Sequence, residues 1–238
     1  MSDPSGSAPD AGVDVRQVLA VGRQTFVGIE LLCGPGALVP RPETEILART
    51  AIARLGATPP AHVGLRLIDM CCGAGNLACA LAMHLPESKV WASDLTDGCV
   101  QWTRRNIDHL GIVDRAVVAQ GDLFAGLEGL GLDSTIDAIV CNPPYISTGR
   151  LAADRAALLE NEPREAFDGG PYGLSIHQRV LADAPRFLKP GGWLFMEFGV
   201  GQHRQVKILI ERTKRFTPPE FVSDRQNAPR VVVTQTLA

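Results

Sequence analysis

The sequence lacks the marks of several large classes of protein. No run of basic residues is longer than a doublet such as Arg104-Arg105, and the net charge is -3, whereas a duplex nucleic-acid partner usually needs a stronger basic surface. No apolar run approaches membrane-spanning length. Residues 1–12 are small and polar, without the basic start and apolar core of a signal peptide. We therefore expect a soluble, cytoplasmic protein, with no membrane partner and with nucleic acid disfavoured.

Signatures of a metal site are missing as well. The six cysteines show no CxxC spacing, and the five histidines are scattered along the chain without a nearby cysteine cluster. The sequence therefore predicts no metal site. The thiols are expected to be reduced and mostly buried.

Length and composition indicate one α/β domain. The chain has 238 residues, of which 45% are hydrophobic and 21% charged, enough for a sizeable core. From residue 64 onward, strand and helix patterns alternate, which predicts right-handed crossovers and a mostly parallel sheet covered on both faces. The predicted strands are 65–70, 89–93, 116–120, 136–141 and 193–198, completed to seven by an antiparallel C-terminal hairpin over 221–223 and 230–236.

The first sixty residues are predicted to form a smaller unit. Residues 14–22 have helical apolar spacing, and 25–33 have the composition of a strand. Gly34-Pro35-Gly36 would turn the chain into a second strand over 37–39, giving a hairpin, before a helix that runs to about residue 55. The predicted divisions are a tail with a short helix (1–24), a hairpin-and-helix lid (25–60) and a main domain (61–238).

A glycine turn follows the first strand of the main domain. Gly73-x-Gly75-x-x-Ala78 matches the dinucleotide-binding fingerprint, with Asp94 at the end of the next strand. One interpretation is therefore a nicotinamide-dependent oxidoreductase. However, Asp69 stands at the strand end before the turn, where a carboxylate would pair with a cation and repel a pyrophosphate. S-adenosylmethionine, which carries an amino acid moiety and no phosphate, fits this pattern better.

Each polar residue of this region then has a predicted role toward the methyl donor. Asp69 would lie near the ammonium group, and Asp94 would accept hydrogen bonds from both ribose hydroxyls. Asp122, after the third strand, would meet the adenine amino group. The alternative for Asp94 and Asp122 is a turn or helix-capping role. The predicted donor-binding residues are Asp69, Cys71, Gly73, Gly75, Asp94, Leu95, Asp122, Leu123 and Asn142.

The strand over 136–141 ends in Asn142-Pro143-Pro144-Tyr145. Two prolines fix φ and remove two backbone donors, which leaves a rigid, acceptor-rich loop. An amide or aromatic amine nitrogen is a poor nucleophile because its lone pair is delocalised. The Asn142 side-chain oxygen and the Pro143 carbonyl could hold both its hydrogens and aim the lone pair at a methyl group. Tyr145 could pack against the flat acceptor. We predict all four loop residues to be catalytic and assign no general base.

Several motifs, taken in order, resemble the HemK/PrmC-type protein glutamine methyltransferases. The match runs from about residue 26 to the end of the chain. Asn-Pro-Pro-Tyr alone also occurs in adenine amino-methyltransferases of nucleic acids, whereas the segments around Arg41 and Glu162 point to the glutamine branch. The matching segments are Leu38–Glu45, Asp69–Gly75, Asp94, Gly121–Phe124, Asn142–Tyr145, Glu162–Gly170, Gly173-Leu174, Leu188–Gly192, Glu197–Gly199 and Gln202.

The resemblance implies a class I Rossmann-like methyltransferase fold that uses S-adenosylmethionine. It implies N-methylation of a glutamine amide in a protein such as a peptide release factor, with Arg41, Glu43 and Tyr145 at the substrate mouth. Two departures stand out. Cys71 replaces the usual first glycine of the donor loop. Only about 25 residues precede the match, where family members usually carry a helical substrate-recognition domain.

Other acceptors and classes stay open. The short N-terminal segment favours the same chemistry on a small molecule or a peptide in specialised metabolism. An adenine methyltransferase acting on nucleic acid is disfavoured by the net charge. The nicotinamide enzyme is disfavoured by Asp69 and by the Asn-Pro-Pro-Tyr loop. A non-catalytic partner protein is a further alternative, and the intact Asn142 argues against it.

Overall fold

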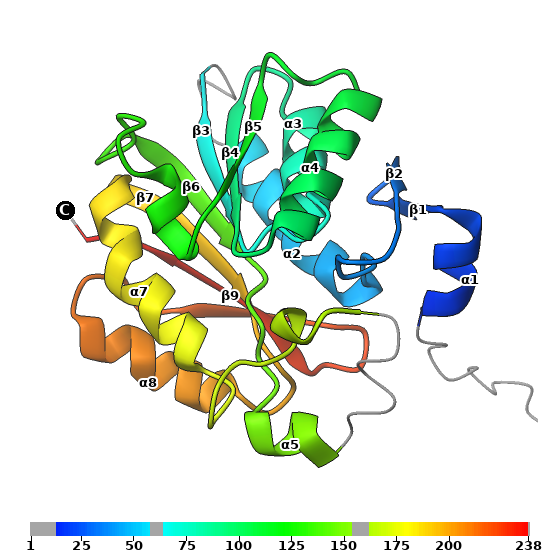
Figure 1. The fold of residues 1–238 in the computed structure, drawn as a ribbon. Helices are drawn as coiled ribbons and strands as arrows, with labels where there is room; N and C mark the ends of the chain where they lie inside the picture. The colour runs from blue at the N-terminus through cyan, green and yellow to red at the C-terminus, as the bar shows by residue number, and fades with distance from the viewer. Residues whose placement is uncertain (1–12, 58–63, 154–161, 238) are drawn as a thin grey trace, which may run out of the picture.

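A computed structural model of the chain describes residues 13–57, 64–153 and 162–237 (Figure 1). The first twelve residues of the predicted N-terminal tail lie outside these ranges, as do residues 58–63, where the predicted lid meets the main domain. Within them, no helix is both long and apolar enough to cross a membrane. The elements are α1 (Val15–Val21), β1 (Arg23–Phe26), β2 (Ile29–Leu32), α2 (Pro42–Gly56), β3 (Arg66–Met70), α3 (Asn76–His84), β4 (Lys89–Asp94), α4 (Asp97–His109), β5 (Ala116–Gln120), η1 (Leu123–Leu127), β6 (Ile136–Cys141), α5 (Thr148–Ala153), η2 (Arg164–Ala166), α7 (Ser175–Phe187), β7 (Leu188–Glu197), α8 (His203–Thr213), β8 (Glu220–Ser223) and β9 (Pro229–Gln235).

Seven strands form one sheet in the order β5-β4-β3-β6-β7-β9-β8. Neighbouring strands from β5 to β7 are parallel, whereas β9 runs antiparallel to both β7 and β8. The chain steps from β3 outward to β4 and β5 and returns on the other side of β3 with β6, so the strand order reverses between β3 and β6. Open α/β sheets bind ligands at such a reversal, outside the carboxyl ends of the strands. The predicted mostly parallel sheet with antiparallel C-terminal strands is confirmed.

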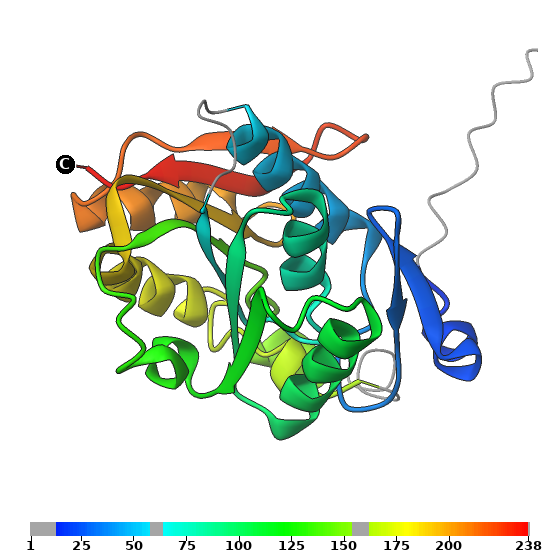
Figure 2. The same cartoon turned by 90° about the horizontal axis from the view of Figure 1, so that it is seen from above.

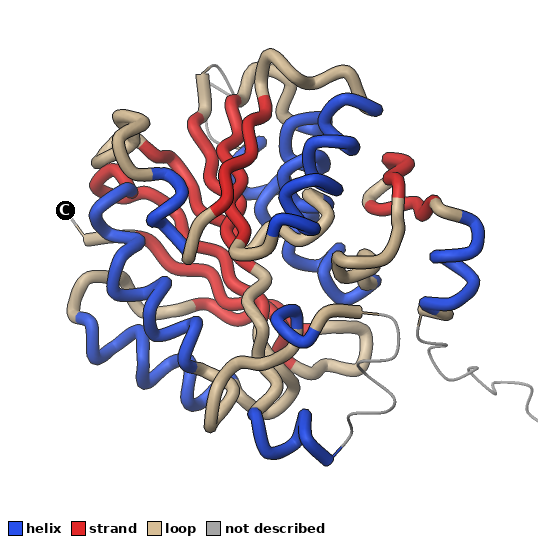
Figure 3. The backbone as a smooth tube through the Cα atoms, viewed as in Figure 1, coloured by secondary structure: helices blue, strands red, loops and turns tan. Residues whose placement is uncertain are grey.

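Helices cover both faces of the sheet (Figures 1 and 2). One core cluster joins α2, α3 and α4 to the sheet, and the other joins η1, α7 and α8 to the opposite face. Side chains of β6 alternate between the two clusters: Val140 belongs to the first, and Ile139 and Cys141 to the second. Because both faces are covered, this strand is apolar along nearly its whole length. In Figure 3 the strands form a central layer between the helices.

The N-terminal hairpin differs from the prediction. β1 and β2 pair through a two-residue turn at Val27 and Gly28, whose φ angles are 47° and 79°. Turns with two positive φ angles match the twist of a hairpin. The single strand predicted over 25–33 is therefore wrong, and residues 37–39 form no strand. Valine rarely adopts positive φ, so this turn could not be recognised from residue type.

The helix α2 brings its first turn to the carboxyl edge of the sheet. Pro42 occupies the first helical position, and Glu43 and Glu45 lie in the first turn, where proline and negative charge suit a helix start. Farther along, Leu47 and Ala51 are fully buried in the core. This packing fixes the helix and thereby the position of its first turn.

Candidate active site

A cavity of about 310 Å³ lies at the carboxyl ends of β3, β4, β5 and β6. Its wall also includes the start of α2 and residues from the 163–168 segment. The predicted site residues in this wall are Arg41, Cys71, Gly73, Asp94, Leu95, Asp122, Leu123, Asn142 and Pro144. The predicted site residues outside the wall are Glu43, Asp69, Gly75, Pro143 and Tyr145.

The turn after β3 is built from left-handed backbone. Cys71, Gly73 and Gly75 have φ angles of 60°, 56° and 80°. Glycine adopts this conformation without steric cost, whereas a cysteine does so at a cost of about 1 kcal/mol. A Cβ at position 75 would approach Thr103 Cγ2 to 2.8 Å, so this glycine is also needed for packing. Cys71 therefore places a strained residue directly in the cavity wall.

Asp94 holds the turn from the end of β4. Its Oδ2 accepts a hydrogen bond from Gly73 N at 2.9 Å, and its Oδ1 accepts one from Thr96 N at 3.1 Å. Burial raises the pKa of Asp94, and these backbone hydrogen bonds oppose the rise. Oδ1 also accepts a longer hydrogen bond from Thr96 Oγ1 at 3.4 Å, whereas Oδ2 keeps a further lone pair. Asp94 can therefore fix the turn and still accept a hydrogen bond from a hydroxyl group of a ligand.

Asp69 lies beneath the turn. Its side chain is fully buried, and its Oδ2 accepts a hydrogen bond from Ala78 N at 2.8 Å. Burial raises the pKa of Asp69 to about 8. Its Oδ1 has no hydrogen-bond partner among the described residues. The predicted contact between a charged Asp69 and the donor's ammonium group therefore gains no direct support from this geometry.

Asp122, Leu123 and Leu95 form another part of the wall. Asp122 stands at the N-cap position of η1 without a capping hydrogen bond from its side chain. Its Oδ2 instead accepts one from Arg179 Nη2 of α7 at 2.8 Å. Leu95 is 55% exposed, and Leu123 has a φ of 52°. Two leucines and a carboxylate in one wall suit a flat heterocycle that carries an amino group.

Asn142 enters the same cavity from the end of β6. Its Nδ2 donates a hydrogen bond to Thr44 Oγ1 at 3.0 Å. Thr44 therefore engages the nitrogen of the side-chain amide and not its Oδ1. Pro144 also contributes to the wall, whereas Pro143 is buried. The predicted role of the Pro143 carbonyl as a second acceptor thus stays a prediction.

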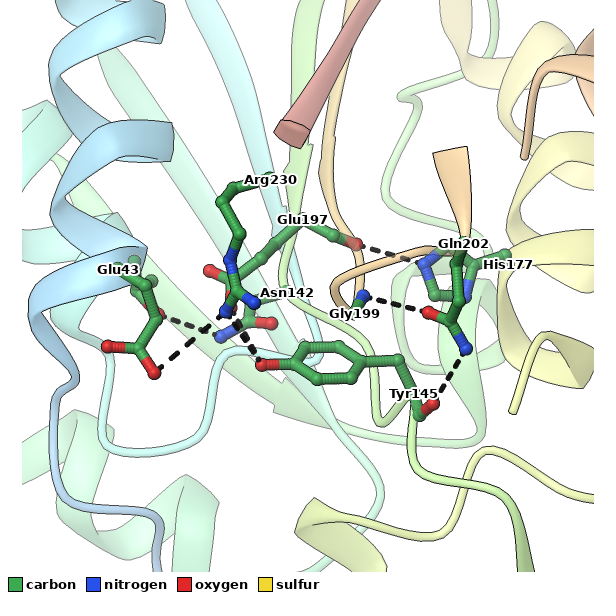
Figure 4. Close-up of polar contacts among 9 residues, drawn as sticks. Glu43, Asn142, Tyr145, His177, Glu197, Gly199, Gln202 and Arg230 are labelled. Atoms are coloured by element: carbon green, nitrogen blue, oxygen red, sulfur yellow. Dashed lines mark hydrogen bonds and ion pairs between the residues drawn. The ribbon is translucent and has the colours of Figure 1, made fainter. Parts of the chain in front are cut away.

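Tyr145 is not among the residues of the cavity wall, and its hydroxyl lies in a cluster of polar side chains (Figure 4). Its hydroxyl donates to Glu197 Oε1 at 3.2 Å and accepts from Arg230 Nη2 at 3.4 Å. The same Arg230 nitrogen lies 3.9 Å from carboxylate oxygens of both Glu197 and Glu43. Burial raises the pKa of Glu197 to about 7, opposed by the hydroxyls of Thr44 and Tyr145 and by the charge of Arg230. Glu43, predicted to bind substrate, therefore belongs to a charge cluster next to the cavity.

The backbone of the Asn-Pro-Pro-Tyr loop is held from the other side. Gln202 Oε1 accepts from Gly199 N at 2.8 Å, and Gln202 Nε2 donates to the Tyr145 carbonyl at 3.0 Å (Figure 4). A Cβ at Gly173 would come within 2.3 Å of the same carbonyl. The close approach of the 169–173 segment thus requires glycine, and it clamps the loop against β7.

Arg41 is engaged by Glu162. Its Nη2 forms an ion pair with Glu162 Oε2, and Glu162 Oε1 accepts a hydrogen bond from Val39 N at 2.8 Å. The Glu162 side chain is only 4% exposed. This contact joins the segment before α2 to the segment after residue 161. In the described structure the Arg41 side chain therefore holds these two segments together through Glu162.

Sequence reasoning missed the roles of several supporting residues. Thr44, Glu162, Glu197 and Gln202 all stand inside the segments that carried the family resemblance, but their local sequence does not indicate which groups they meet. Arg230 lies in β9 and has no motif around it. A buried charge in an otherwise apolar strand is the one signal that could have drawn attention to it.

The wall suits a ligand without phosphate groups. The two arginines among its described residues are both paired, Arg41 with Glu162 and Arg164 with Asp168 Oδ2 at 2.8 Å. The Asp94 carboxylate is hydrogen-bonded to the glycine turn, and its negative charge would repel a pyrophosphate. Asp94, two leucines and the open space above Gly73, where a Cβ would meet nothing within 4 Å, fit the ribose, base and amino acid parts of S-adenosylmethionine.

Sequence comparisons agree with this geometry. Residues 55–167 match the family model described as Methyltransferase small domain. A release factor glutamine methyltransferase of Geobacter sulfurreducens is 37% identical over 193 residues, which cover 81% of this chain and 64% of that protein. A relative of the same name from Moorella thermoacetica is 34% identical over 203 residues, which cover 85% of this chain and 69% of the relative.

A third relative has a different acceptor in its name. The 4-amino-L-phenylalanine/4-methylamino-L-phenylalanine methyltransferase of Streptomyces pristinaespiralis is 36% identical over 206 residues, covering 83% of this chain and 65% of that protein. Among solved structures, a methyltransferase from Pyrococcus furiosus superposes with a TM-score of 0.62 at 15% identity, covering 94% of this chain and 96% of its own. That likeness establishes the fold alone.

Proposed function

The chain belongs to the release factor glutamine methyltransferase family, and we propose that it transfers a methyl group from S-adenosylmethionine to a side-chain amide nitrogen. The acceptor is a glutamine of a protein such as a peptide release factor. The observation that carries this proposal is a single cavity whose wall contains both Asp94 and Asn142. One space bordered by both residues supports a methyl donor and a methyl acceptor bound next to each other.

On the donor side, S-adenosylmethionine supplies an electrophilic methyl group bound to a sulfonium. Asp94 accepts hydrogen bonds from the ribose hydroxyls while Gly73 N keeps its carboxylate in place. Leu95 and Leu123 pack against the adenine, whose amino group donates to Asp122. The Arg179 partner of Asp122 fixes the direction of that carboxylate without removing its remaining lone pairs.

On the acceptor side, orientation replaces a strong base. The Asn142 Oδ1 accepts a hydrogen bond from the NH₂ group of the amide and turns the plane of the acceptor toward the methyl group. As the bond between nitrogen and the methyl carbon forms, the bond between that carbon and sulfur breaks and leaves neutral S-adenosylhomocysteine. The positive charge passes to the acceptor nitrogen, which loses one N–H proton to water, so the transition state needs little additional charge compensation. The Tyr145 hydroxyl is held by Glu197 and Arg230, and this keeps the loop rigid while the amide is bound.

A second candidate keeps the chemistry and changes the acceptor. The Streptomyces pristinaespiralis relative is named for an aromatic amine, and an aniline nitrogen shares the planar NH₂ group and delocalised lone pair of an amide. A small arylamine therefore fits the same Asn142 acceptor. Nucleic acid is disfavoured because both arginines of the wall are paired. A cytoplasmic location stays a prediction for either acceptor.

Mass spectrometry can separate these candidates. The protein is incubated with S-adenosylmethionine and, in separate reactions, with a bacterial release factor, 4-amino-L-phenylalanine or an adenine-containing oligonucleotide. We expect one added methyl group on a glutamine of the release factor. Methylation of the arylamine alone would replace the first candidate with the second. A thermal shift with NAD and none with S-adenosylhomocysteine would overturn the methyltransferase assignment.

A further inference from the structure

Thr44 is a buried hydroxyl at the junction between α2 and the Asn-Pro-Pro-Tyr loop. Its side chain belongs to the cavity wall, and the residue is 1% exposed. Its Oγ1 accepts the hydrogen bond from Asn142 Nδ2 at 3.0 Å. Thr44 is therefore positioned to decide which end of the Asn142 amide turns toward a bound acceptor.

The direction of this hydrogen bond is not fixed by Thr44 itself. A hydroxyl can donate or accept, so Thr44 could equally donate to Asn142 Oδ1 and turn the amide nitrogen into the cavity. The acceptor's NH₂ group would then face another NH₂ group and lose its hydrogen bond. A third group therefore has to determine whether Thr44 accepts a hydrogen bond from Asn142 or donates one to it.

Glu197 is that third group. It is 1% exposed at the end of β7, and its Oε2 has no hydrogen-bond partner among the described residues. The nearby Thr44 hydroxyl is one of the groups that lower the pKa of this carboxyl. An ionised carboxylate only accepts hydrogen bonds, so a Thr44 hydroxyl that donates to the unpaired Oε2 of Glu197 keeps only its acceptor function toward Asn142. Figure 4 shows the Tyr145 hydroxyl meeting the side chains of Glu197 and Arg230.

We propose that Thr44 and Glu197 are positioning residues that set the orientation of the Asn142 amide, with its oxygen presented to the methyl acceptor. The proposal deepens the function proposed above and rests on it. The observed hydrogen bond runs from Asn142 Nδ2 to Thr44 Oγ1, and the proposed one continues from the Thr44 hydroxyl to the unpaired Oε2 of Glu197. Protonation of Glu197 reverses the last bond and releases the constraint.

The charged groups around Glu197 make this relay sensitive to pH. Burial raises the pKa of Glu197 to about 7, Arg230 lowers it, and Glu43 raises it further. Tyr145 stays neutral because burial raises its pKa well above the usual value. His177 donates to the Glu197 backbone carbonyl at 2.9 Å, and burial lowers its pKa to about 4. Glu197 is therefore the group of this cluster that changes charge near neutral pH.

Turnover of three variants tests the proposal. Thr44→Val keeps the shape and removes the hydroxyl, Thr44→Ser keeps the hydroxyl, and Glu197→Gln keeps an acceptor that does not titrate. We expect Thr44→Val to lower kcat about 100-fold with an unchanged Kd for S-adenosylhomocysteine. Thr44→Ser should retain most of kcat. In the wild type, kcat should fall below a pH of about 7, and this limb should vanish in Glu197→Gln.

A second readout works without an acceptor. The side-chain ¹⁵NH₂ resonance of Asn142, assigned with Asn142→Asp, is followed against pH in the complex with S-adenosylhomocysteine. We expect it to shift with the titration of Glu197 in the wild type and to stop shifting in Thr44→Val. A Thr44→Val variant with wild-type kcat, or with the wild-type pH response of this resonance, would overturn the relay. A wild type that methylates no glutamine defeats the proposed function, while the resonance still tests the relay.

Discussion

The proposed donor side and the proposed acceptor side of the cavity are constructed differently. The donor side consists of short stretches directly after β3, β4 and β5, joined by contacts between neighbouring strands such as Gly73 N to Asp94. The acceptor side gathers buried side chains from distant parts of the chain: Thr44 and Asn142 are 98 residues apart, and Tyr145 and Arg230 are 85 apart. A local change should therefore weaken donor binding alone, whereas the acceptor side depends on several remote elements at once.

The contact between Glu162 and Arg41 is expected to give the largest effect on stability. Glu162→Ala leaves a mostly buried arginine without its partner, which costs about 3 kcal/mol of unfolding free energy. Urea denaturation measures this loss. Glu165→Ala, an exposed carboxylate in the same segment, should change stability by less than about 0.5 kcal/mol. Equal stability of the two variants would show that the segment is not anchored through Arg41.

The glycine at position 173 tests how tightly the acceptor loop is clamped. Gly173→Ala introduces a Cβ within 2.3 Å of the Tyr145 carbonyl at a φ of 71°, so we expect a loss of about 2–3 kcal/mol and reduced turnover. Gly149→Ala is the matched control, because its Cβ meets nothing within 4 Å. Thermal unfolding of both variants gives the comparison, and a fully stable Gly173→Ala would disprove the clamp.

The Asp94→Ala variant tests whether a change on the donor side affects donor binding without affecting turnover at saturating donor. Asp94→Ala removes charged hydrogen bonds worth about 1.5–3 kcal/mol, so we expect the Kd for S-adenosylhomocysteine to rise about 10–100-fold in calorimetry. At saturating donor, kcat should change much less. Asp97→Ala, at an exposed position just beyond the cavity wall, should bind like the wild type. A large loss of kcat at saturation would mean that the two sides are not separable.

Cys71 should give the smallest effect, and one of opposite sign. Because its φ is 60°, Cys71→Gly relieves backbone strain and should raise the unfolding free energy by about 1 kcal/mol. Cys71→Ala retains a Cβ and should give no such gain. Chemical denaturation of the two variants separates backbone strain from loss of the thiol. A gain in both variants would point to the thiol as the source of destabilisation.

The same contrast explains what could be predicted from the sequence. The parallel sheet and the donor turn follow from local patterns, since Gly73 and Asp94 stand directly at predicted strand ends. The hairpin was misread because Val27 adopts a turn conformation that valine rarely takes. The orientation proposed for Asn142 could not be foreseen, because its hydrogen bond to Thr44 joins residues that only the packing of α2 against the end of β6 brings together.

The measurement that tests the account most directly compares the wild type with Asn142→Ala at donor concentrations that saturate both proteins. Calorimetry with S-adenosylhomocysteine should give the same Kd for the two proteins within about twofold. Mass spectrometry should find one methyl group on a glutamine of the release factor with the wild type. With Asn142→Ala, turnover should fall by about 10²–10³. Methylation at the wild-type rate by Asn142→Ala would contradict the assignment of the acceptor side.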